Sequence, residues 1–531
     1  MSLAPHRHGP SMLNRPSPTG PGHGGSDLLY NGADWTFDTL RQSYDAIERI
    51  AETELKLEIY PNRIEVITPE QMLDVYTSHG MPLIYKHWSF GKRFVGHQNA
   101  YKRGLMGLAY EVVINSNPCI SYLMEENSAT MQALVIAHAA FGHNHFFRNN
   151  RIFREWTEPS GILDYLEFAR SYISRCEERH GMRAVERILD AAHALQNQGV
   201  NRHSGAKMMD LKAEQQRDRE RREHEDRAYN DLWRTLPNGK AALAADTIGD
   251  RRRRLGLPEE NLLYFLEKNA PKLKPWEREV IRIVRLIAQY FYPQPQAKMM
   301  NEGCATWVHQ AIMRRLHEQG RINDAAFLEV IHSTTNVISQ PGFDNPGGGS
   351  FNPYALGYAM MTDIARICET PTAEDRSWFP DIAGNQDAVG TLKHAWAEYR
   401  DESFIQQFLS PTVMRQFRMF RLLDDVAKPY LLVDDIHDDV GYREIRRSLA
   451  RSYDPSQYYV ELEIVDVDLA GDRCLRMEHK TRPGQLLAEQ DARATLRHLA
   501  ELWGYEVKLI EIDPQTDTVL ATHSVSPLSA G

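Results

Sequence analysis

Two stretches of the chain carry side chains that bind metals or transfer protons. Residues 129–147 begin as an apolar segment and end in a group of histidines, and residues 289–309 contribute a glutamate and a further histidine. Imidazole nitrogens and carboxylate oxygens together suit Zn²⁺, Mn²⁺ or Fe²⁺. We therefore predict two facing helices that share a metal site. The metal ligands expected from this pattern are His138, His143, Glu302 and His309.

The spacing of these side chains restricts how one ion could be bound. His138 and His145 lie seven residues apart, which on an α-helix places them on nearly the same face but about 10.5 Å apart along the axis. A metal ion holds its ligands at about 2 Å, so both cannot reach one ion from an unbroken helix. Three solutions stay open: a helix break at Gly142 that brings His138 and His143 together, two metal ions, or ligation by only some of these residues.

A carboxylate, Glu111, lies in the apolar stretch 105–115. The periodicity predicts a helix here, with Glu111 and Asn115 on one face, and a further helix over 121–147. A carboxylate inside an apolar segment is costly unless it is paired, ligates a metal or points to solvent. Glu111 and His145 are the candidate catalytic residues, because carboxylates and imidazoles transfer protons.

The same residues support several chemistries. A bound metal would lower the pKa of a coordinated water toward about 7 and polarise a carbonyl group, which predicts a metal-dependent hydrolase. An oxygen-dependent reaction at Fe²⁺ uses similar ligands. A buried network of hydrogen bonds without metal is the structural alternative, and dispersed roles for these side chains are another. A non-catalytic scaffold is the rival to the enzyme.

Residues 83–100 are rich in aromatic side chains and include His87 and Trp88. Such a segment is typical of a stretch that packs against the core. Histidines in this setting are more often buried hydrogen-bonding groups than metal ligands. We therefore predict a packing role for this segment.

The composition indicates a folded protein and argues against several classes. Of the 531 residues, 42% are hydrophobic and 25% charged, as in globular chains, and the net charge of −10 argues against nucleic-acid binding. The five cysteines are widely spaced and include no Cys-x-x-Cys pair, so neither a disulfide framework nor a zinc ribbon is expected. No run approaches the roughly 20 apolar residues of a membrane span, and we expect a cytoplasmic protein.

The periodicity predicts a mainly α fold, with a large helical N-terminal domain and a small α+β C-terminal domain. Residues 1–33, rich in Pro, Gly and Ser, are expected to form a disordered tail. Residues 34–425 show helical spacing, which is interrupted at 210–254 by charges of alternating sign that indicate an exposed insertion. Residues 426–531 change to strand-like alternation with one helix.

Two short motifs resemble those of zinc peptidases. HisAlaAlaPheGlyHis (138–143), followed distantly by AsnGluGlyCysAla (301–305), is similar to families in which a His…Gly-His helix is completed by a downstream Glu. In those enzymes a Glu follows the first His and acts as general base. Here this position is Ala139, so another group would have to accept the proton.

Longer motifs resemble the SpoVR family (stage V sporulation protein R) over residues 34–525. They are HisAlaAlaPheGlyHisAsnHisPhePhe, TyrPheTyrProGlnProGlnAlaLysMetMetAsnGluGly, AsnProTyrAlaLeuGly and ArgAspGluSerPheIleGlnGlnPheLeuSerPro. One position departs, since Cys304 stands where the family usually has Trp. The resemblance implies a cytoplasmic bacterial protein of spore cortex formation, or of stress physiology, with a PrkA-type serine kinase and a von Willebrand-like protein as partners. It implies no established reaction.

Overall fold

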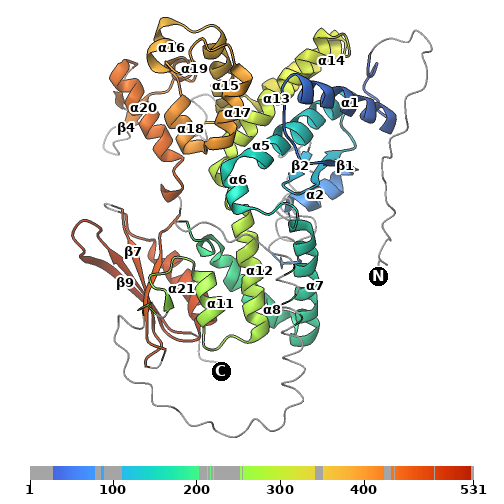
Figure 1. Ribbon diagram of the computed structural model, residues 1–531. Helices are drawn as coiled ribbons and strands as arrows, with labels where there is room; N and C mark the ends of the chain where they lie inside the picture. The colour runs from blue at the N-terminus through green and yellow to red at the C-terminus, as the bar shows by residue number, and fades with distance from the viewer. Residues whose placement is uncertain are drawn as a thin grey trace.

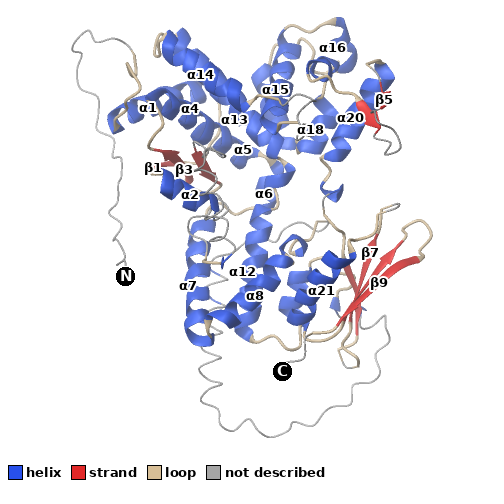
Figure 2. Ribbon diagram, turned by 180° about the vertical axis from the view of Figure 1, so that it is seen from behind, coloured by secondary structure: helices blue, strands red, loops and turns tan. Residues whose placement is uncertain are grey.

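The protein is described by a computed structural model, in which the described residues are mainly helical (Figures 1 and 2). The predicted fold class, mainly α with a smaller C-terminal α+β part, is confirmed. None of the described helices is both long and apolar enough to cross a membrane. Most of the predicted tail and of the charged insertion lies outside the described residues. These are 28–77, 85–88, 111–202, 255–340, 351–423, 432–435 and 437–527 except positions 458, 470, 483 and 484, and isolated positions between 212 and 253.

The upper part of the molecule in Figure 1 is built around α13 (Lys298–Glu318). This helix packs against the histidine-bearing helix η1 (Ile136–His143) and against α15 (Pro353–Glu369). Its buried side chains belong to one continuous hydrophobic core. The other helices of this part are α1 (Phe37–Thr53), α4 (Ala129–Val135), α5 (Asn144–Asn149), α6 (Arg151–Trp156), α14 (Asp324–Val337), α16 (Ala373–Trp378), α17 (Ala388–Glu398), α18 (Asp401–Phe408), α19 (Pro411–Gln416) and α20 (Asp439–Ser452).

A three-stranded sheet contacts η1. Figure 2 shows two of its labelled strands close to α2. Its order is β1–β3–β2, with β1 parallel and β2 antiparallel to β3. The prediction of helix was wrong for 111–114 and 121–124. The β-branched residues at 112–114 favour a strand, and pairing with β3 satisfies their backbone groups. The elements of this region are β1 (Asn62–Ile67), α2 (Pro69–Thr77), β2 (Glu111–Ile114) and β3 (Cys119–Met124).

Glycines let α13 approach the backbones of two neighbours. A Cβ added at Gly142 of η1 would lie 2.5 Å from the Cα of Ala305, and one added at Gly303 would lie 2.6 Å from the carbonyl carbon of Gly357 in α15. Carbon atoms do not pack this closely, so only glycine permits these contacts. The position of α13 is therefore fixed by backbone contacts on both sides.

A side chain from a distant part of the chain caps the first turn of α13. The N-cap residue, Ala297, offers no side-chain acceptor. Asp401, which is buried, instead accepts hydrogen bonds from the backbone N–H groups of Met299 at 2.8 Å and Met300 at 2.9 Å. Burial raises the pKa of Asp401 to about 7, although the two N–H donors favour the ionised form. Asp401 thus fixes the turn of α13 that carries Asn301 and Glu302.

We expect the stabilising contribution of Asp401 to decrease as the pH rises. Its folded pKa of about 7 lies above the ordinary value of 3.8, so between these values the folded state binds more protons than the unfolded state. The free energy of unfolding should therefore fall by about 1.4 kcal/mol per pH unit in that window. Urea unfolding of wild type and Asp401→Asn should show the wild type losing stability relative to the variant between about pH 5 and about pH 7. A constant difference would contradict the prediction.

The lower part in Figure 1 holds a second hydrophobic core, which α12 (Pro275–Phe291) shares with the C-terminal sheet. The sheet order is β6–β7–β8–β9, with β7 and β8 parallel and the outer pairs antiparallel. Helix α20 packs against α18 in the upper part, and the predicted domain boundary at 425/426 stays a prediction. The elements here are α7 (Ile162–His180), α8 (Met182–Ala194), α11 (Leu262–Asn269), β6 (Glu463–Val467), β7 (Leu475–Lys480), α21 (Glu489–Trp503), β8 (Val507–Ile512) and β9 (Val519–Val525).

Candidate metal centre

His138 and His143 lie on η1, which is a π-helix rather than an α-helix. In a π-helix the backbone hydrogen bonds close at i+5, so side chains five positions apart fall on one face. The two imidazole rings stand edge to face with their centroids 4.7 Å apart. The wider helix therefore brings these histidines together without a break at Gly142, whose role is the close contact with α13.

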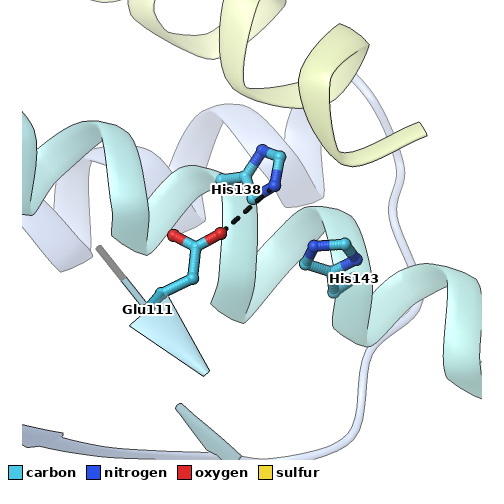
Figure 3. Close-up of side chains that lie close together, drawn as sticks. All are labelled: Glu111, His138 and His143. Atoms are coloured by element: carbon cyan, nitrogen blue, oxygen red, sulfur yellow. Dashed lines mark ion pairs between the residues drawn. The ribbon is translucent and has the colours of Figure 1, made fainter. Parts of the chain in front are cut away.

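Glu111 joins the two histidines from a different element (Figure 3). Its Oε1 lies 3.2 Å from Nε2 of His138. Ligand atoms of Glu111, His138 and His143 all lie within 4.8 Å of one another. Within the described part of the chain, this is the one group of three His, Cys, Asp or Glu side chains that converges in this way. Strand β2 supplies the carboxylate, and η1 supplies both imidazoles.

Glu302 approaches the same cluster from α13. Its Oε2 lies 3.5 Å from Nε2 of His143, yet this oxygen is buried and makes no hydrogen bond. Nδ1 of His143 lies 2.9 Å from Oδ1 of Asn301, and because an amide oxygen only accepts, Nδ1 carries a proton. With Nδ1 directed at Asn301, Nε2 is the ring nitrogen of His143 that faces the Glu302 carboxylate. A cation between these two atoms would stabilise the arrangement.

His309, predicted as a metal ligand, contacts His138 on the side away from Glu111. The two Nδ1 atoms lie 2.8 Å apart, and Nε2 of His309 lies 3.2 Å from Oγ1 of Thr334 in α14. Both nitrogens of His309 thus have hydrogen-bond partners, as is usual for a residue that orients a metal-binding histidine. The contact of Thr334 with His309 could not be predicted from the sequence, because a single threonine in a helical segment does not indicate a role at a site.

Burial sets the protonation states of the cluster. It raises the pKa of Glu111 well above its usual range, and the neighbouring Glu302 adds to the shift. Burial, with His143 and His309 contributing, lowers the pKa of His138 well below its usual range. Burial also lowers the pKa of His309 to about 3. Both imidazoles are therefore neutral at neutral pH, the state in which a ring nitrogen binds metal.

The cluster lines a cavity of about 700 Å³, a volume typical of a small-molecule site. The described residues around it include no lysine or arginine. Its apolar wall is formed by Val112, Val113, Met131, Leu134, Val135, Phe147 and Val337. Its other polar side chains are Gln294, Asn301, Thr306, Ser333, Thr334, Asn352 and Tyr354. The acidic side chains of the described lining are thus Glu111 and Glu302.

His145, predicted as a catalytic residue, does not line this cavity. Its Nδ1 lies within hydrogen-bond distance of the backbone N–H and C=O of Glu58 and of Nδ2 of Asn149. Its ring packs edge to face against Trp396, and burial lowers its pKa to about 4. The structure brings Glu111, His138, His143 and Glu302 together and places His145 in the protein core.

Comparison with known proteins agrees with the motifs. Two family models match the chain, "SpoVR like protein" over residues 34–458 and "SpoVR-like C-terminal domain" over residues 460–514. A protein of Escherichia coli (strain K12), called "Uncharacterized protein YcgB", is 50% identical over 484 residues, which cover 91% of this chain and 93% of that protein. No solved structure matches the chain. The chain therefore belongs to the SpoVR family.

Proposed function

We propose that the protein is a metal-dependent hydrolase in which one divalent cation, Zn²⁺, Mn²⁺ or Fe²⁺, is held by His138 and His143 together with Glu302, which lies beside His143 but outside the converging group of Glu111, His138 and His143. The observation that carries this proposal is the buried Oε2 of Glu302, which makes no hydrogen bond and lies 3.5 Å from a ring nitrogen of His143. A buried carboxylate oxygen is costly without a compensating partner. Two imidazoles and a carboxylate are also a known ligand set of catalytic zinc sites.

The residues around the ligands have separate roles in this proposal. When bound, the metal would act as a Lewis acid and lower the pKa of a water molecule. Glu111 accepts a proton at its carboxylate and returns it to the leaving group, which suits a carboxyl group whose pKa is raised by burial. Asn301 and His309 orient the rings of His143 and His138 through their Nδ1 atoms.

The lining of the cavity favours an uncharged substrate. No described lining residue is a lysine or arginine that could pair with a phosphate or carboxylate group. The apolar wall and the amides of Gln294 and Asn301 suit a neutral amide or ester. Cytoplasmic location, a role in sporulation or stress, and the PrkA-type kinase and von Willebrand-like partners stay predictions from the resemblance.

Metal titration of protein prepared without a histidine tag tests the proposal. We expect one equivalent of metal per chain, and at a concentration of 100 times the Kd a gain of about 2.7 kcal/mol in the free energy of unfolding. Hydrolysis of neutral chromogenic amides or esters should require the metal and stop when a chelator is added. A folded protein that binds none of the three metals would contradict the metal site, and metal binding without hydrolysis of any such compound would contradict the hydrolase.

A further inference from the structure

A second cavity of about 640 Å³ lies in the lower part of the molecule, where α8, α12 and α21 pack together (Figure 1). Its lining includes Tyr85, His87 and Trp88 together with Tyr459 and His498, and Gln294 lines both this cavity and the first. The proposed hydrolase uses none of its other residues. Its volume and its partly aromatic lining are typical of a ligand site.

Asp190 supplies the carboxylate of this second cavity. Its Oδ1 accepts hydrogen bonds from Nε1 of Trp88 at 2.6 Å and from Nε2 of His87 at 3.0 Å. No described residue bonds its Oδ2, and 35% of the side chain is exposed. The described lining contains no lysine or arginine and no second carboxylate. Asp190 is therefore held at Oδ1, and among the described residues Oδ2 has no hydrogen-bond partner.

Aromatic rings form much of the wall around this carboxylate. Trp88, Phe291, Tyr292 and Tyr459 line the cavity, and the faces of such rings attract cations. The guanidinium group of Arg202 lies over the ring of Tyr459, 5.1 Å from its centroid, so a cation of the chain itself already contacts that ring and the other three rings are the ones left for a ligand. Aromatic faces beside a single carboxylate are the arrangement that recognises organic ammonium groups.

We propose that this second cavity binds a small organic cation, a primary or quaternary amine, whose charge lies beside Oδ2 of Asp190. The apolar part of the ligand packs against Val284, Ile287 and Ala288 of α12. An anion is disfavoured by the carboxylate. A metal ion is disfavoured because, in the part of the chain that the structure describes, His, Cys, Asp and Glu atoms converge on a metal position only in the first cavity.

Choline and its neutral isostere, in which carbon replaces the nitrogen, provide a direct test on the full-length protein. Isothermal titration calorimetry should show saturable binding of choline, with the isostere at least about tenfold weaker because it lacks the charge. In Asp190→Asn the amide oxygen can still accept from His87 and Trp88, so the fold is kept while the charge is lost. This variant should bind choline about tenfold more weakly.

Asp381→Asn is the matched control, since Asp381 is exposed and does not line the cavity. Its choline affinity should equal that of the wild type, and all three proteins should bind metal alike. Equal affinity for choline and the isostere, no saturable binding of choline, or unchanged affinity in Asp190→Asn would each overturn the proposal. None of these results would bear on the metal centre.

Discussion

Replacing Glu302 with Gln should lower the affinity for the metal by at least about 100-fold. Loss of an outer hydrogen-bond partner of a metal ligand already costs 10–100-fold, and loss of a ligand should exceed that range. The substitution keeps the size of the side chain but removes the charge that faces His143 at 3.5 Å. Competition against a chelating dye gives the affinity of each variant.

The same substitution should raise the free energy of unfolding of the metal-free protein. Without a cation, the buried Oε2 of Glu302 has no hydrogen bond, and its negative charge lies near Glu111. Removing that charge relieves the cost of burying it. If the cluster is instead a hydrogen-bonded network without metal, Glu302→Gln should lower the free energy of unfolding, because Gln would then break a stabilising contact. Denaturant unfolding of both proteins in the presence of a chelator distinguishes the metal site from the metal-free network.

Glu318→Gln is a suitable control for both measurements. Glu318 lies on the same helix as Glu302 but at its far end, with its side chain 50% exposed. Its replacement should leave the metal affinity unchanged. An equal loss of affinity in both variants would show that the effect of Glu302→Gln is not that of a lost ligand.

Gly303→Ala should lower the free energy of unfolding by about 3 kcal/mol. The added Cβ would lie 2.6 Å from the carbonyl carbon of Gly357 and 2.7 Å from its Cα, so α13 and α15 would have to separate. Backbone atoms on both sides leave no flexible side chain to move aside. Because α13 carries Glu302, the displacement should also weaken metal binding, which urea unfolding and metal titration of the same variant can show.

Gly161→Ala provides the comparison for this effect. A Cβ at Gly161 would meet nothing closer than Cγ of Glu158, at 3.7 Å, which is an ordinary contact. Its replacement should change the stability by less than about 1 kcal/mol. If the two alanine variants unfold at the same urea concentration, the close packing of α13 on α15 does not stabilise the protein.

The main features of the candidate centre could be predicted from residue type and local pattern. An apolar helix ending in histidines and a second helix with Glu302 were expected to face each other, and α13 does pack against η1. The change from helical to strand periodicity in the C-terminal part can also be read from neighbouring residues alone. The structure has strands β6 to β9 in this part.

Other features depend on contacts between distant segments. The π-helix places His138 beside His143 and leaves His145 in the core, and periodicity based on 3.6 residues per turn cannot show this. The segment of Glu111 becomes a strand because β3 is available to pair with it. Asp401 reaches the start of α13 from about a hundred positions further along the chain.

The π-helix also affects how relatives of this protein can be recognised by alignment. An α-helix would bring two histidines to one face with three residues between them, whereas η1 does so with four. A one-residue length change between His138 and His143 could therefore be absorbed by exchanging one helix type for the other, without moving α5 or the ligands. Searches that treat such a gap as the loss of the motif would miss homologues that keep the same centre.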